Sequence, residues 1–155
     1  MQKLWAAPHV TFKGRWHTIE DAGINPRPAS GKVPIWFGGH HDRTLDRIAK
    51  WGDGWMPNAY MPGPEATQVL GRLRHLSEAA GRDPAQVGIE AWVSMGTGSE
   101  ADWAKEARFW KAAGASHICL TTTFNRRHHK RIPGHTLSDH LAALRRYHTA
   151  VAAEL

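Results

Sequence analysis

From residue 33 onward, short apolar runs typical of β-strands alternate with amphipathic stretches typical of helices. The alternation repeats four times. Because such alternation forms parallel sheets with right-handed crossover helices, the chain is expected to have an α/β fold. The runs that predict the four strands are 33–37, 54–57, 87–95 and 116–123.

The spacing of these strand–helix units narrows the choice of architecture. Divided among four units, residues 33–155 give about 31 residues per unit. A complete TIM (β/α)8 barrel of roughly 250 residues has the same average, so four units would make half a barrel. A four-stranded open sheet fits the same alternation. Residues 1–32 show little periodicity, and they are expected to form an irregular lead segment with a short hairpin around Val10–His17.

The helices carry start signals. Asp42 is expected to cap the first helix, and Pro64 suits the first turn of the second. Ser99 is expected to cap the third helix. The last helix, capped by Thr136 or Ser138, carries apolar residues at helical spacing: Leu141, Leu144, Tyr147 and Val151.

A pair of glycines ends the first predicted strand. Gly38 and Gly39 carry no Cβ, so their backbone N–H groups are open to a close approach, and the positive end of the next helix points to the same place. This arrangement suits a phosphate group. Alternatively, the glycines only relieve crowding at a tight turn. His40 follows them and either donates to a phosphate oxygen or lies in an exposed loop.

Polar residues also follow two of the other strands. Asn58 comes after the second strand and Thr122 ends the last one, on the face where barrels place their sites. Trp55 is expected to pack between its strand and a helix. The basic run Arg126–Arg131 attracts an acidic group or is simply solvated. The histidines form no ordered set of metal ligands, so no metal site is expected.

Composition bears on the partners. The net charge of +6 raises the question of nucleic-acid binding, but apart from residues 126–131 the charges are dispersed, which argues against it. No apolar run approaches the roughly 20 residues of a membrane span. The single cysteine, Cys119, excludes an intrachain disulfide, and a reducing cytoplasm is the simplest home.

Five segments together carry a family resemblance: residues 10–17, 23–28, 33–39, 52–55 and 113–115. In order and spacing, they resemble the carboxyl-terminal half of the bacterial luciferase-like, flavin-dependent oxidoreductases. The actinobacterial branch that often uses a deazaflavin is especially similar. That family folds as a complete eight-stranded barrel. The resemblance therefore implies four parallel βα units over residues 33–155, forming half of a TIM (β/α)8 barrel.

The same resemblance implies an oxidoreductase that acts on a small-molecule substrate. With FMN the reaction would be monooxygenation, and with a deazaflavin (coenzyme F420) it would be hydride transfer. Gly38 and Gly39 would line the cofactor phosphate site, with His40, Asn58 and Thr122 as further candidate contacts. No catalytic acid or base can be identified from the sequence. The sequence also leaves open whether this chain is active alone.

A half barrel has two open sheet edges, here the first and last strands, and an uncovered inner face. The chain is therefore expected to pair with a second copy, as a homodimer, or with a missing amino-terminal half barrel. An alternative from another class is a non-catalytic remnant that dimerises and binds a phosphorylated ligand. A basic nucleic-acid binder is the third.

Overall fold

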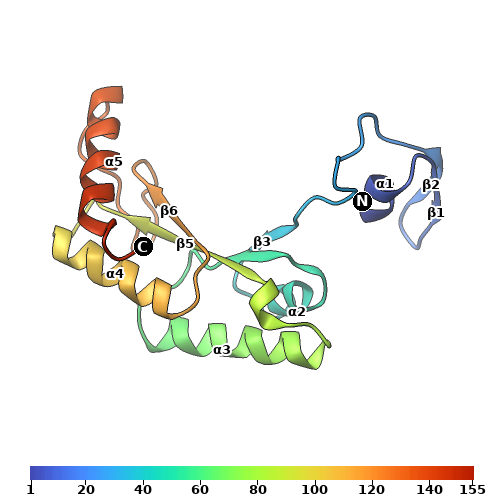
Figure 1. Ribbon diagram of the computed structural model, residues 1–155, viewed down its shortest axis with the longest axis horizontal. Helices are drawn as coiled ribbons and strands as arrows, with labels where there is room; N and C mark the ends of the chain where they lie inside the picture. The colour runs from blue at the N-terminus through green and yellow to red at the C-terminus, as the bar shows by residue number, and fades with distance from the viewer. The chain divides into compact units, whose positions relative to one another are not determined.

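A parallel sheet of four strands, in the order β3-β4-β5-β6, organises most of the chain (Figure 1). The computed structural model describes residues 1–155. The expected α/β fold with a four-stranded parallel sheet is confirmed, and the first and last of these strands form its edges. The strands are β3 (Trp36–Gly38), β4 (Gly54–Met56), β5 (Gly88–Ser94) and β6 (His117–Thr121).

A helix follows each strand, and the helices lie against one face of the sheet (Figure 1). None of them has both the length and the apolarity needed to cross a membrane. A one-turn 3-10 helix, η1, precedes β5. The helices are α2 (Asp42–Trp51), α3 (Pro64–Ala79), η1 (Pro84–Gln86), α4 (Glu100–Ala112) and α5 (Leu137–Val151).

The chain divides into two units, Met1–Ile35 and Trp36–Leu155. The first unit holds a short helix, α1 (Gln2–Ala6), and an antiparallel hairpin of β1 (Val10–Lys13) and β2 (Thr18–Ala22). This hairpin extends further than the expected range 10–17, because a second strand follows the turn at Gly14, whose N–H donates to His17 O at 2.8 Å.

The predicted strand boundaries differ from the observed ones by up to three residues, most at the first strand, and the predicted cap of the first helix is wrong. The first strand begins at Trp36 and not at Val33, since Pro34 has no N–H to give to a strand ladder. The cap of α2 is His41, whose Nδ1 accepts from Arg43 N at 3.3 Å. Asp42 is instead the first helical residue.

The capping signals of the later helices are confirmed. Ser99 forms a capping box with Asp102 at the start of α4, and Thr136 forms one with Asp139 at the start of α5. In each box the carboxylate accepts from the backbone of the cap residue while the cap hydroxyl accepts from the third helical residue.

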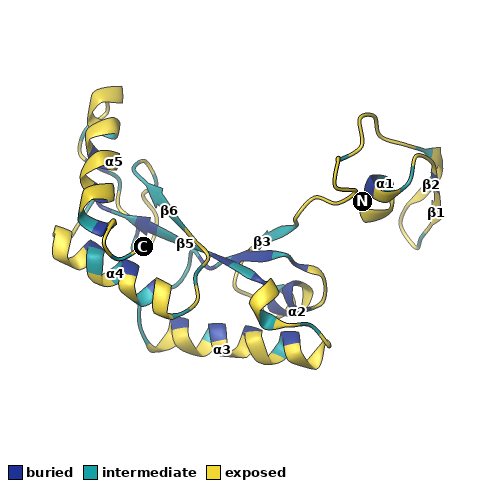
Figure 2. Cartoon of the chain, in the orientation of Figure 1, coloured by how far each residue is buried: buried dark blue, intermediate teal, exposed yellow.

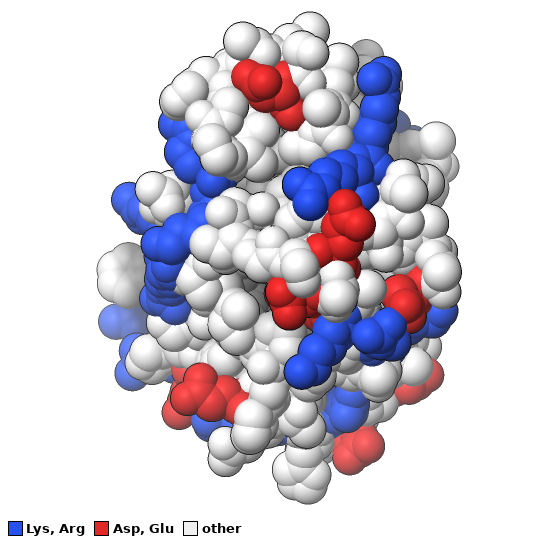
Figure 3. All heavy atoms as spheres, turned by 90° about the vertical axis from the view of Figure 1, so that its left-hand side faces the viewer, with Lys and Arg blue, Asp and Glu red and all other residues white.

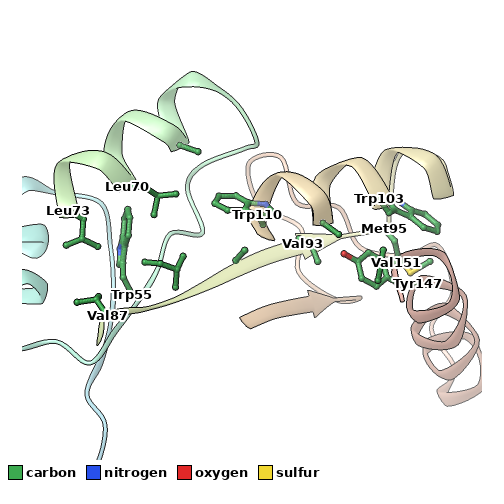
Figure 4. Close-up of a cluster of buried hydrophobic side chains, with 14 of the residues drawn as sticks. Trp55, Leu70, Leu73, Val87, Val93, Met95, Trp103, Trp110, Tyr147 and Val151 are labelled. Atoms are coloured by element: carbon green, nitrogen blue, oxygen red, sulfur yellow. The ribbon is translucent and has the colours of Figure 1, made fainter. Parts of the chain in front are cut away.

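The covered face of the sheet carries the core. Along β5, Ile89, Ala91 and Val93 are buried, and the side chains of α3 and α4 that face the sheet are buried with them (Figures 2 and 4). Trp55 has no exposed surface and packs in this core, as predicted. Other members of the core are Leu70, Leu73, Trp103, Trp110 and Tyr147.

The other face of the sheet has no helix over it. Here Trp36 lies beside Gly54 in the register, and Gly54 lies beside Gly88. A Cβ atom on Gly54 would come within 2.3 Å of the Trp36 ring, and one on Gly88 within 2.6 Å. The indole therefore crosses both glycines, and its ring meets the His117 ring edge-on at a centroid distance of 5.2 Å.

Helix α5 divides the apolar residues that were expected to act together. Tyr147 and Val151 are buried against the core, whereas Leu141 and Leu144 are exposed by 41% and 43%. The four apolar residues thus span more of the helix surface than the main neighbour of α5, α4, can cover.

Candidate functional site

The candidate site is the edge of the sheet where the four parallel strands end. Carboxyl ends of parallel strands meet at one edge, and loops there commonly carry ligand sites. All five predicted site residues lie at this edge. Gly38 is the last residue of β3 and Gly39 and His40 follow it, Asn58 follows β4, and Thr122 follows β6.

The glycine pair presents open backbone. Apart from Gly38 and the two residues next to it in the chain, no residue has an atom within 4 Å of the place where a Cβ of Gly38 would be. Gly39 has a φ of +94°, a left-handed conformation that favours glycine, and its carbonyl accepts from Trp55 Nε1 at 2.8 Å. The core tryptophan thus fixes the loop, while the exposed side of the pair stays accessible. This cradle fits the approach of a phosphate group.

The remaining predicted residues differ in how they are held. His40 is exposed. The Thr122 hydroxyl lies 2.8 Å from His140 Nδ1, and the Thr122 carbonyl accepts from Ile132 N. Since β3 and β6 are opposite edges of the sheet, the structure does not bring Thr122 against the glycine pair.

Asn58 is joined to a histidine from the loop between β6 and α5. His129 Nε2 lies 3.2 Å from the Asn58 carbonyl oxygen. A carbonyl only accepts, so Nε2 carries the proton and Nδ1 of the neutral ring is a bare acceptor. His129 is 2% exposed, and its Nδ1 has no partner. Burial lowers the pKa of His129, and the bond to Asn58 partly opposes this.

The loop that carries His129 is anchored across the end of the sheet. Lys130 N donates to Ser94 Oγ at 3.1 Å, and a Cβ on Gly96 would meet the carbonyl oxygens of Lys130 and Arg131 at 2.4 and 2.5 Å. His129 is also in ring contact with Trp92 and Phe124. In the sequence His129 stands out only as part of the basic run and of a group of histidines without metal-ligand spacing, since no local pattern shows that this loop folds back.

The basic run itself lies mostly at the surface. Arg126, Arg127 and Lys130 are exposed, while Arg131 lies 2.6 Å from His135 Nδ1. On the face drawn in Figure 3, Lys and Arg side chains gather along the left side and are mixed with Asp and Glu over the rest. No group of three or more His, Cys, Asp or Glu side chains is placed to hold a metal ion.

A cavity of about 490 Å³ lies beside this edge. Glu106 of α4 lines it, and burial raises the pKa of this carboxyl to about 6, opposed by the Trp110 side chain. His128 also lines it, and burial, His129 and Arg127 lower the pKa of His128 to about 4. No local pattern in the sequence points to Glu106, which lies in an ordinary charged helical pattern. The lining comes from residues 61–63, 94, 97–98, 102–103, 105–106, 109 and 128–129.

Nearly the whole chain is similar to known proteins. A family model described as luciferase-like monooxygenase matches residues 1–154. An F420-dependent hydroxymycolic acid dehydrogenase of Mycobacterium tuberculosis is 25% identical over 116 residues. That match covers 74% of this chain but 31% of the relative. An uncharacterized protein of the same organism is 33% identical over 79 residues, 51% of this chain and 26% of the relative. The chain thus spans less than a third of these relatives.

Two solved structures share the fold over nearly the whole chain. The monooxygenase RslO1 from Streptomyces bottropensis has a TM-score of 0.66 at 16% identity, covering 98% of this chain and 57% of that one. An F420-dependent secondary alcohol dehydrogenase in complex with an F420-acetone adduct has a TM-score of 0.53 at 18% identity. That match covers 97% of this chain and 50% of the dehydrogenase chain.

Proposed function

Because the chain belongs to the luciferase-like monooxygenase family, we propose that it is the cofactor-phosphate side of a flavin-type oxidoreductase. In this proposal residues 33–155 form the carboxyl-terminal half of a (β/α)8 barrel, and residues 1–32 lead into it. The observation that carries the proposal is the accessible glycine pair at the end of β3, with open space at Gly38.

Five residues would hold the cofactor, which is FMN or F420. The N–H groups of Gly38 and Gly39 would donate to the phosphate, and His40 would add a further donor. The Asn58 side chain and Thr122 would bind other polar groups. The bound cofactor supplies the redox chemistry, while the protein binds and orients it and excludes water.

The basic loop offers a way to distinguish the two cofactors. Arg126, Arg127 and Lys130 are exposed near the end of β6. Their positive charge would attract the oligoglutamyl tail of F420, a group that FMN lacks. If F420 is the cofactor, replacing all three with alanine weakens F420 binding and leaves FMN binding unchanged.

A partner would complete the barrel. The edge strands β3 and β6 have free sides, and one face of the sheet has no helix over it. The matched structures are covered to 50% and 57%, which supports a chain that supplies about half of such a barrel. Either a second copy or a separate amino-terminal half would fill this role.

Fluorescence titration with F420 and with FMN tests the proposal, alongside light scattering to give the oligomeric state. Gly38→Val should lower affinity at least tenfold with no loss of stability, because its side chain enters open space where the phosphate would approach. Gly71→Val, on an exposed and open position of α3, is the matched control. Saturable binding of inorganic phosphate without either cofactor would favour the non-catalytic remnant instead.

A further inference from the structure

The cavity beside α4 has the size and walls of a small-molecule site. Its volume of about 490 Å³ lies within the range of ligand pockets. Met61 and Pro62 from the loop after β4, and Trp103 and Phe109 from α4, supply apolar and aromatic walls. None of the five proposed cofactor residues lines it, so it is separate from the phosphate cradle.

One wall of the cavity carries a buried acceptor with no partner. His129 lines the cavity, is 2% exposed, and has no hydrogen-bond partner at Nδ1. Its other ring nitrogen is held by the Asn58 carbonyl, which fixes the lone pair on Nδ1. Buried polar atoms in proteins are nearly always paired, so an orphaned acceptor on a residue that lines a cavity indicates a missing donor.

A second acceptor lines the same cavity. The Glu106 carboxyl is partly buried beside the Trp110 side chain, and burial raises its pKa to about 6. Above that pH the carboxylate is charged and poorly solvated, and a cation would stabilise it. His128, also on the wall, is neutral at pH 7 because burial lowers its pKa, so it does not repel a cation. Asp102 and Lys105 also line the cavity with opposite charges, so an ionised Glu106 leaves the wall with a net negative charge.

We propose that this cavity binds a small amine with an apolar or aromatic body, whose ammonium group donates to His129 Nδ1 and to the Glu106 carboxylate. Trp103 and Phe109 would contact the body of the ligand, and their ring faces also favour a cation. An anion would be repelled by Glu106, and a neutral alcohol could satisfy the acceptors without neutralising the charge. This site does not depend on the proposed cofactor function.

Three probes of one shape test the proposal on the full chain: benzylamine, benzyl alcohol and benzoate. At pH 7.5, calorimetry should show benzylamine binding at least tenfold more tightly than benzyl alcohol, with no benzoate binding. Glu106→Gln should remove the preference for the amine, and His129→Phe should weaken benzylamine at least tenfold. Glu78→Gln and His148→Phe, both exposed on the surface, are matched controls that should bind as the wild type does.

A spectroscopic readout keeps the test independent of how the variants fold. In nitrogen-15 spectra of the wild-type chain, benzylamine should shift the His129 Nδ1 resonance in the direction of a newly accepted hydrogen bond. The proposal is overturned if benzylamine binds no better than benzyl alcohol. It is equally overturned if benzylamine saturates while His129 Nδ1 does not move.

Discussion

The two faces of strand β5 differ in how complete they are. Ile89, Ala91 and Val93 are buried on the face that α3 and α4 cover. The residues between them, which include Glu90 and Trp92, are only partly buried on the other face. One strand thus belongs both to a closed core and to a surface with no helix over it.

The difference shows which face of the sheet this chain can cover without a partner. On the covered face, apolar side chains from strands and helices fill the space between them. On the open face, polar groups are satisfied locally, as where Trp92 Nε1 donates to Glu90 Oε1 at 2.8 Å. The covered face accounts for folding, and the open face is the surface that a completing partner would cover in the proposed barrel.

Matched tryptophan substitutions should give the largest effect. Trp55→Ala removes a side chain with no exposed surface and should cost about 3–5 kcal/mol of unfolding free energy. Trp92→Ala removes a partly exposed ring and one hydrogen bond, and should cost about 1–2 kcal/mol. Urea unfolding followed by far-ultraviolet circular dichroism measures both.

If Trp55→Ala is too unstable to compare, Trp55→Phe gives a milder change on the same face. Equal costs for the two tryptophans would break the comparison, since they would mean that the open face contributes to the core of the isolated chain as much as the covered face does.

Glu106 should show that the helix side is not uniformly stabilising. Its carboxyl has a pKa of about 6 against a usual 4.5, so the native state holds more protons than the unfolded state between these values. The free energy of unfolding therefore falls as pH rises through this interval. The Glu106→Gln side chain does not ionise, so its free energy of unfolding does not fall in this way. The variant should be more stable than the wild type at pH 7.5 by up to about 2 kcal/mol.

Unfolding curves at pH 4 and pH 7.5 check this prediction. The advantage of Glu106→Gln should nearly disappear at pH 4, where the wild-type carboxyl is protonated in both states. An advantage of the same size at both pH values would mean that the substitution acts through packing and not through ionisation.

The glycines beneath Trp36 should give a smaller effect. Gly54→Ala places a Cβ within 2.3 Å of the indole, which must move off the open face at a cost of about 1–2 kcal/mol. Gly38→Ala, where the space is open, should change stability by less than about 0.5 kcal/mol. Near-ultraviolet circular dichroism should change for Gly54→Ala alone, and a change for both variants would contradict this account.

The smallest expected effect is on the rate at which Cys119 is alkylated in the chain without a partner. The register places this residue beside Trp92 on the open face. Burial raises the pKa of the Cys119 thiol, and the negative charge of Glu90 raises it further. Iodoacetamide should therefore react several-fold more slowly than with a free thiol at pH 7.5. If a second copy covers the open face, the rate should fall further as protein concentration rises, whereas a constant rate across concentrations would argue against that pairing.

Local signals made much of the fold predictable. Alternating periodicity located all four strands, and the Ser99 capping box placed the start of α4 correctly. Errors arose where a neighbour decides the outcome. His41 caps α2 because its ring can turn back to Arg43 N, and Leu141 is exposed because α5 packs on one side alone.

The candidate site divides in the same way. The Gly38–Gly39 cradle could be located from sequence, because a bare backbone after a strand is a local property. His129 and Glu106 could not, because they line one cavity only after the loop following β6 folds back over the end of β5. Their chemistry comes from burial and from contacts such as the Asn58 carbonyl, which is 71 positions away in the chain.

The indole that crosses Gly54 and Gly88 also constrains how this protein can evolve. A bulkier residue at either glycine becomes acceptable only after position 36 has lost its large ring, and a smaller residue at 36 leaves two bare glycines with nothing above them. Related chains should therefore inherit positions 36, 54 and 88 as a block, and exchange them together or not at all.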